Sequence, residues 1–539
     1  MEKHEGEHKM RIEALNGIAG RFLIALMALM AVGIGLAKAD PVRGGTLNST
    51  LWPEPPGLII GINLNAPTLL PATKIFEGLL TYDFNLNPEP MLAKSWEVSK
   101  DGLIYTFHLR HNVKWHDGAP FTSKDVVFSL TKFIPEVHSR SRATFKRVQV
   151  TAPDDYTVVV TLKEPYGPLL RSFDAISAPI VPAHIYEGTN YRDNPANRHP
   201  IGTGPFKFDE WKPGQYIHLV RNDDYYIKGE PYLDDIYYRF IPDSASRALA
   251  LESGQVQLAT QNDLELVDVK RLNSNPSLKV TTKGWEWGSP ISWLEMNIRR
   301  KPFDDVRFRK AVMYALDRNF IRDTIFFGFA KVATGPIHSS SPFYTDDVTK
   351  YAYDPAKAKA LLDEMGLKPD ADGVRVKIGL LGLPYGEMWD RLSQYIKQAL
   401  GAVGVEVTLQ PSDVAGWGNR IANWDVDMST TYLTTLSDPA LGVARTYLTD
   451  NQKKGVLFTN TSGYSNPEVD KLFAEAASLP DQDKRKALYD KAQKILTDQV
   501  ALAWLVELQW PTVYSAKLKN VVINGLGPNG NFASAYFEK

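Results

Sequence analysis

The pattern of hydrophobic and polar positions predicts strands in the first half of the chain. Residues 103–109 alternate large apolar residues with others before an Asp-Gly turn at Asp117, and residues 156–162 (YTVVVTL) follow a turn rich in aspartate. A shorter apolar run at 46–52 indicates a further strand near the beginning of the folded part. The spacing of two is typical of strands that have one buried face.

Helices are predicted from start signals that are followed by apolar residues at spacings of three and four. Thr122 stands three residues before Asp125, Asp354 precedes Pro355, and Asn466 precedes Pro467, and each pair is typical of a helix amino end. In the last helix of this group one face holds Val469, Leu472, Phe473 and Ala476. After Leu479-Pro480-Asp481 a further helix carries a second stripe, which holds Leu488, Ala492, Ile495 and Leu496. These two stripes predict a helical pair packed on a larger body.

The region 354–410 predicts an α/β unit. A helix from Trp389 to Leu400 is followed by Gly401 and then by alternating apolar residues at Val405, Val407 and Leu409. Helices that alternate with strands are typical of a sheet that is at least partly parallel. The chain is therefore expected to be of the α/β class.

The amino end has the pattern of an export signal. An uncharged apolar run from Phe22 to Leu36 follows Arg21 and precedes small residues, so we expect a signal peptide over residues 1–39 with cleavage after Ala39. A membrane anchor is the alternative, although the run is shorter than the roughly 20 residues that span a bilayer. Charges before the run sum to zero from Met1 but to +1 from Met10, and because signal peptides begin with a positive region, we hypothesise that Met10 is the true start.

Composition excludes several functions. The 539 residues contain no cysteine, which removes disulfides, thiolate metal sites, cysteine nucleophiles and a lipid-anchored cysteine after the signal. Because 61 Lys and Arg balance 62 Asp and Glu, no charge excess indicates a nucleic-acid partner. The protein is thus expected in the periplasm, free of lipid.

Enzyme motifs are not found. The chain lacks a phosphate-binding loop, a Gly-x-Ser-x-Gly elbow and a His-Glu-x-x-His pair, and its closest histidines, His108 and His111, would point to opposite faces of a strand. Acidic pairs such as Asp304-Asp305 stand at helix starts, where capping explains them. We therefore expect no catalytic residue, no metal site and no cofactor.

Distinctive short segments follow one another along most of the chain after residue 40. They are Gly44-Gly45-Thr46-Leu47, Ile75-Phe76-Glu77-Gly78-Leu79, residues 90–97, 105–110, 116–118, 125–129, Gly202-Thr203-Gly204-Pro205-Phe206, residues 222–226, 302–311, 315–318 and 466–470. In this order they resemble the family 5 extracellular solute-binding proteins of ABC importers, the dipeptide and oligopeptide-binding group.

The resemblance implies a bilobal type II periplasmic-binding fold with an additional α+β domain. Lobe I would comprise residues 40–83, 198–292 and 508–539, domain II residues 84–197, and lobe III residues 293–507. Crossings between the two lobes would act as hinges that close around a solute. The implied function is a monomeric receptor that captures a peptide or peptide-like solute and delivers it to inner-membrane permease subunits. An enzyme or chaperone on the same scaffold is the competing interpretation.

The resemblance also indicates ligand-binding residues. Peptide-binding members have a tryptophan, then an aspartate that pairs with the ligand's amino group, then Asp-Pro or Glu-Pro. Here Tyr432 takes the tryptophan place, Thr435 falls where the aspartate is expected, and Asp438-Pro439 is kept. Because threonine cannot neutralise a buried ammonium, an oligosaccharide, an opine-like conjugate or a modified peptide competes with a free-amine peptide. The expected ligand-binding residues are Trp285, Trp287, Trp417, Tyr432, Thr435 and Asp438.

Overall fold

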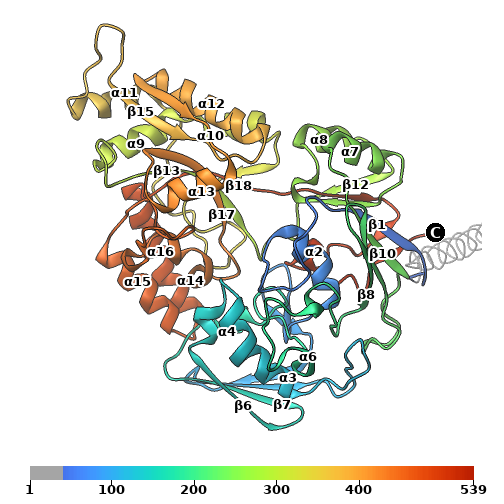
Figure 1. Cartoon of the computed structure of the whole chain (residues 1–539). Coiled ribbons are helices and arrows are strands. Elements are labelled where there is room, and N and C mark those ends of the chain that lie inside the picture. Colours follow the sequence, from blue (N-terminus) through green and yellow to red (C-terminus); the bar gives the residue numbers. More distant parts are fainter. Residues whose placement is uncertain (1–40) are drawn as a thin grey trace, which may run out of the picture. The chain divides into compact units, whose positions relative to one another are not determined.

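The computed structural model describes residues 41–539 (Figure 1). The predicted signal peptide, its cleavage after Ala39 and the alternative start at Met10 lie outside the described residues. Within the described part, no helix is long and apolar enough to span a membrane.

A seven-stranded mixed sheet draws its strands from three separate parts of the chain. Their spatial order is β12 (Leu278–Thr281), β19 (Thr512–Ser515), β11 (Leu258–Thr260), β1 (Thr46–Thr50), β10 (Asp235–Arg239), β9 (Tyr216–Arg221) and β8 (Phe206–Lys212). β1 runs parallel to β10 and β11, whereas β19 runs antiparallel to both of its neighbours. Helices α2 (Ala66–Ile75), α7 (Ser244–Glu252) and α8 (Leu266–Leu272) belong to the same segments.

A second sheet of six strands lies between two groups of helices. Its order is β14 (Ala330–Val332), β18 (Ala503–Leu508), β13 (Pro290–Met296), β17 (Met428–Thr434), β15 (Val376–Leu381) and β16 (Val405–Gln410). β15 is parallel to β16 and β17, which confirms the partly parallel sheet predicted near 354–410. Helices cover it: α9 (Val306–Ala315), α10 (Arg318–Phe320), α11 (Pro355–Glu364), α12 (Glu387–Gly401), α13 (Val414–Ala422), α14 (Pro439–Gly442), α15 (Pro467–Ser478) and α16 (Gln482–Gln499).

A third sheet is wholly antiparallel and comes from one continuous stretch. It consists of β4 (Ala93–Val98), β5 (Ile104–Leu109), β7 (Thr157–Leu162) and β6 (Val148–Asp154). The stretch also holds α3 (Ser123–Phe128), the π-helix Ser129–Phe133, α4 (Ile134–Val137), α5 (Arg142–Phe145) and α6 (Ala183–Tyr186). Two-stranded pairs β2 (Leu80–Tyr82) with β3 (Pro88–Pro90), and β20 (Leu518–Lys519) with β21 (Tyr536–Phe537), complete the strands.

The strands of the three sheets can be compared with the residue ranges predicted for lobe I, domain II and lobe III. Each sheet takes its strands from one of lobe I, domain II and lobe III, except that β13 begins three residues before residue 293 and β18 ends on residue 508. One continuous apolar core joins the lobe I and domain II segments, whereas the six-stranded sheet packs its own cores on its two faces. The segment boundaries themselves stay a prediction, and the names lobe I, domain II and lobe III are kept for these residue ranges.

The predicted helix starts are confirmed by capping contacts. The Asn466 side chain accepts the backbone N–H groups of Glu468 and Val469, and Asp354 accepts that of Lys357. At α3 the Asp125 carboxylate accepts the Thr122 N–H at 3.0 Å. Such contacts satisfy donors that have no partner inside the helix.

The stripe predicted on α16 packs against the core, but it covers only part of the buried face. Ala492 and Leu496 are buried as expected, but Leu488 and Ile495 are only half-buried. The buried face also contains polar residues, namely Arg485, Tyr489, Gln493 and Thr497. A rule based on apolar spacing missed this face because Arg485 is buried by pairing with an aspartate.

Candidate functional site

Two chain crossings connect the seven-stranded and six-stranded sheets and meet at a pair of tryptophans. The first crossing runs from β12 to β13, and the second runs from β18 to β19 (Figure 1). Trp285 on the first crossing packs edge-to-face on Trp510 of the second, with ring centroids 5.1 Å apart. Contact between the two crossings places this tryptophan pair at the connection between lobe I and lobe III.

Tyr432, near the end of β17, lies at the centre of an aromatic cluster. Its ring stacks on Trp389 at 5.5 Å and meets Trp510 edge-on at 5.5 Å and Tyr385 at 6.3 Å. We call Trp285, Tyr385, Trp389, Tyr432 and Trp510 the aromatic cluster. Trp389 is buried, but Tyr385 has 45% of its surface exposed and Tyr432 is half-buried, so the cluster has an accessible side.

A hollow of about 70 Å³ borders the aromatic cluster and has walls from both lobes. Lobe I contributes Gln261 and Leu264, and lobe III contributes Tyr385 and Met388, with Trp510 of the second crossing between them. A space that two hinged bodies line together changes when they move, which is the arrangement expected of a solute-binding cleft.

Thr435 joins the end of β17 to the first crossing. Its hydroxyl donates a hydrogen bond to the Ser289 carbonyl at 2.8 Å, and its backbone N–H donates to the same oxygen at 3.3 Å. Thr435 is buried. The hydroxyl at the position where an aspartate was expected is therefore already engaged with the protein backbone.

Asp438 forms a buried ion pair and caps a helix. Its carboxylate accepts two hydrogen bonds from the Arg485 guanidinium, at 2.7 and 2.8 Å, and the backbone N–H of Ala440 at the start of α14. The two paired side chains are 0% and 3% exposed. Burial alone would lower the pKa of Arg485, but the charge and hydrogen bonds of Asp438 raise it above the ordinary range.

Trp287 and Trp417 are each buried with their indole N–H engaged. Trp287 donates to the Asp174 carboxylate at 3.1 Å within the core shared by lobe I and domain II. Trp417 donates to the Ser429 hydroxyl at 3.2 Å beneath β17. Of the six predicted ligand-binding residues, the structure brings Trp285 and Tyr432 into the aromatic cluster, and places the other four in internal contacts.

Sequence reasoning did not select Tyr385 or Trp510 for the site. Trp510 could have been found, because it follows β18 at the second crossing that a discontinuous lobe requires. Tyr385 precedes α12 in a loop, and nothing in its local pattern marks it.

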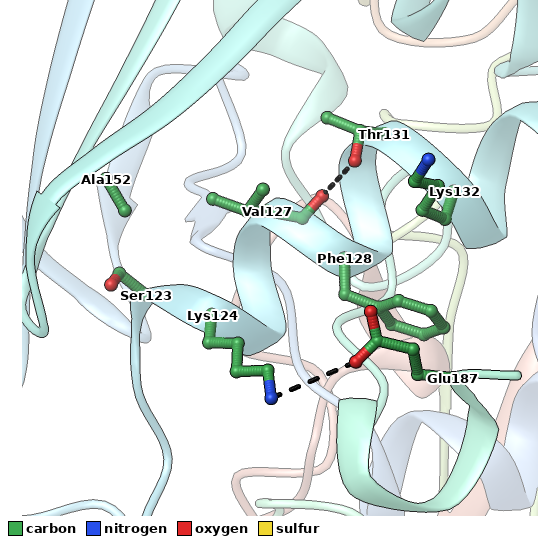
Figure 2. Close-up of a pocket in the computed structure, with 8 residues that line it drawn as sticks. All are labelled: Ser123, Lys124, Val127, Phe128, Thr131, Lys132, Ala152 and Glu187. Atoms are coloured by element: carbon green, nitrogen blue, oxygen red, sulfur yellow. Dashed lines mark hydrogen bonds and ion pairs between the residues drawn. The ribbon is translucent and has the colours of Figure 1, made fainter.

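A larger hollow, of about 330 Å³, lies on domain II and is not part of this cleft. Figure 2 shows its walls, which include the Lys124–Glu187 ion pair at 3.8 Å and Thr131, whose hydroxyl donates to the Val127 carbonyl. All of its walls come from domain II, so a hinge motion between the lobes would not open or close it.

Comparison with known proteins finds relatives that align with most of this chain. The glutathione-binding protein GsiB of Pectobacterium atrosepticum is 28% identical over 452 residues, which is 79% of this chain and 82% of that protein. The oligopeptide-binding protein AppA of Bacillus subtilis is 30% identical over 515 residues, 88% of this chain and 92% of AppA. Its solved structure with a nonapeptide has a TM-score of 0.76 and 27% identity, covering 93% of this chain and 100% of that chain.

The protein AgaA of A. tumefaciens R10, solved with agropinic acid, has a TM-score of 0.75 and 26% identity, covering 92% of this chain and 99% of that chain. Residues 87–455 match the family described as bacterial extracellular solute-binding proteins, family 5, middle part. Proteins of this kind are solute-binding receptors of ABC transporters and not enzymes, which removes the enzyme interpretation. The chain therefore belongs to the family 5 bacterial extracellular solute-binding proteins.

Proposed function

We propose that this receptor captures a small peptide-like solute in the cleft between lobe I and lobe III and delivers it to inner-membrane permease subunits. The observation that carries the proposal is the aromatic cluster, which sits on both crossings and borders a hollow lined by both lobes. A solute that touches both lobes favours the closed arrangement by its differential affinity, and a permease can recognise that arrangement.

The proposal assigns different roles to the six predicted residues. Tyr432 offers aromatic surface to the solute, which suits planar amides, apolar side chains and sugar rings, whereas the buried Trp285 supports Trp510 from the first crossing. Thr435 and Asp438 hold the end of β17 in place through Ser289 and Arg485. Trp287 and Trp417 support the two lobes from their cores.

An opine-like conjugate is the second candidate solute, ahead of an oligosaccharide. It is favoured by Thr435, whose engaged hydroxyl offers no negative charge to a ligand ammonium. AgaA, solved with agropinic acid, has a similar fold. The proposal also includes cleavage of the signal after Ala39, residence of the free monomer in the periplasm, and no cofactor.

A panel of solutes tests the receptor proposal. Glutathione, tetra-alanine, agropinic acid and a neutral trisaccharide are titrated against the mature protein, with melting temperature and calorimetry as readouts. We expect saturable binding of at least one peptide-like or opine-like member, a raised melting temperature and no turnover. Tyr432→Ala should weaken that binding about tenfold or more, whereas the control Tyr353→Ala, an exposed tyrosine outside the cluster, should not. No binding by any member would overturn the proposal.

A further inference from the structure

A hollow of about 250 Å³ lies within lobe III and is separate from the cleft. Its walls come from α9, α10, β14, α16, β18 and the loop 349–353. None of these wall residues belongs to the aromatic cluster or lines the hollow between the two lobes. Because every wall belongs to lobe III, movement of the lobes about their crossings neither forms nor closes this space.

Arg318, in α10, lines this hollow and has no acidic partner among residues 41–539. Its guanidinium donates to three backbone carbonyls, those of Tyr351 at 2.6 Å, Ala333 at 2.8 Å and Trp504 at 3.4 Å. These contacts tie three segments of lobe III together, but they leave the positive charge without a counter-charge. Burial lowers the pKa of Arg318 from 12.5 to about 10, so the group still carries its charge at neutral pH.

Arg318 differs from another arginine of lobe III that is held by carbonyls. Arg309, in α9, uses all three guanidinium nitrogens on backbone carbonyls, and it does not line the hollow. The Nε of Arg318 has no hydrogen bond with any described residue, and its Nη2 has one. Because a guanidinium has five N–H donors, two donors on these adjacent nitrogens remain for a ligand, and they match the two oxygens of a carboxylate.

The charged residues around the hollow favour an anion over a cation. Lys350 also lines it, and its ammonium lies 3.7 Å from the Asp346 carboxylate in a pair whose side chains are both exposed, so that pair is weak. Among the described residues that line the hollow, only Asp317 is acidic. One of its carboxylate oxygens accepts the backbone N–H groups of Asn319 and Phe320 at the start of α10, so the acid is engaged in capping.

Apolar side chains line the hollow beside Arg318. They include Leu316, Val332 and Trp504, and the Trp504 indole N–H already donates to the Tyr447 hydroxyl at 2.9 Å. These walls suit the hydrocarbon part of a ligand. A cavity of about 150 Å³ holds benzene, so this hollow has room for a single ring that carries a carboxylate.

We propose that this hollow is a second binding site, which takes a small organic monocarboxylate: the carboxylate pairs with Arg318, and the apolar body of the ligand contacts the wall around Trp504. The site is distinct from the cleft and does not require the transported solute. The bound acid supplies the counter-charge that Arg318 lacks, and it therefore stabilises lobe III.

The test uses benzoate as the probe and two matched compounds. Benzamide keeps the ring without the charge, and acetate keeps the carboxylate without the ring. Each is titrated by calorimetry against the mature protein at constant ionic strength, and the melting temperature is recorded in parallel. We expect saturable binding of benzoate with a raised melting temperature, and binding of benzamide and of acetate that is weaker by about tenfold or more.

Two pairs of variants locate the site. Arg318→Gln should weaken benzoate binding about tenfold or more, whereas Arg322→Gln should change it less than about twofold, because Arg322 is paired with Asp323 at 2.6 Å and does not line the hollow. Thr349 lines the hollow and has no hydrogen bond among the described residues. Thr349→Trp should fill the space and abolish benzoate binding, whereas Thr349→Ser should retain it. This second pair leaves the three hydrogen bonds of Arg318 in place, so it does not depend on the stability of Arg318→Gln.

The cleft variant Tyr432→Ala separates this site from the cleft. It should bind benzoate as wild type does. The proposal is overturned if benzoate does not bind, if benzamide binds as tightly as benzoate, or if Thr349→Trp binds benzoate as wild type does. Loss of benzoate binding in Tyr432→Ala would place the probe in the cleft and would also overturn the second site.

Discussion

Replacing Asp438 by asparagine should strongly destabilise lobe III. Asparagine caps a helix about as well as aspartate does, so the start of α14 is preserved and the main change is the loss of one negative charge. Arg485 is then left with only 3% of its side chain exposed and without a counter-charge. Because both side chains are almost fully buried, solvent does not screen their interaction, and removing one partner of such a pair costs about 3–5 kcal/mol of unfolding free energy.

The assay is urea unfolding followed by tryptophan fluorescence at pH 7, with Asp413→Asn as the matched control. Asp413 caps α13 by accepting the Gly416 N–H at 2.6 Å, but it is exposed and has no arginine partner among the described residues. The control should change the unfolding free energy by less than about 0.5 kcal/mol. A companion variant that adds Arg485→Met to Asp438→Asn should recover part of the loss, because it removes the uncompensated charge.

Two results would refute this reasoning. If Asp438→Asn is no less stable than Asp413→Asn, the ion pair contributes little. If Asp438→Asn keeps its stability but loses solute binding, the carboxylate acts on the solute and its pairing with Arg485 is secondary.

Three further predictions concern buried groups. Trp417→Ala should lower the unfolding free energy by about 3–5 kcal/mol in urea, because the ring fills the core beneath β17; a loss below 1 kcal/mol would contradict that placement. Burial raises the pKa of Glu77 from 4.5 to about 7, so between these pH values the folded state holds a proton that the unfolded state has lost, and the unfolding free energy falls as pH rises. The unfolding free energy of Glu77→Gln should therefore rise by about 3 kcal/mol relative to that of wild type between pH 4.5 and 8. A difference between the two proteins that stays constant over this range would exclude the titration. Burial lowers the pKa of His138 from 6.5 to about 4, so as pH falls the unfolded state takes up a proton before the folded state does, and the unfolding free energy falls between pH 6.5 and 4. The melting temperature of His138→Gln should therefore fall less than that of wild type over this range, and an equal fall would contradict the prediction.

Much of the fold could be predicted because local signals and burial agree. Caps such as Asn466 and Asp354, and the alternation of β5 and β7, depend on neighbouring residues alone. The buried face of α16 could not be predicted in full, because Arg485 is buried only through Asp438, a partner on a distant segment.

The candidate site was predicted less completely for the same physical reason. Tyr432 was reached through a resemblance, whereas its neighbours Tyr385 and Trp510 come from a loop and a crossing that meet it only in three dimensions. Trp417 has the composition of a binding residue, but nothing in a sequence distinguishes a tryptophan in a cleft from one in a core.

The position of β19 has a consequence for the order in which the protein can mature. β19 is paired between β11 and β12, yet in the chain it follows the whole of lobe III. When a chain crosses a membrane amino end first, β11 and β12 must wait with unpaired edges until residues 512–515 emerge. Strand pairings that are distant in the chain also form slowly. The seven-stranded sheet can therefore be completed only after the whole of lobe III has emerged.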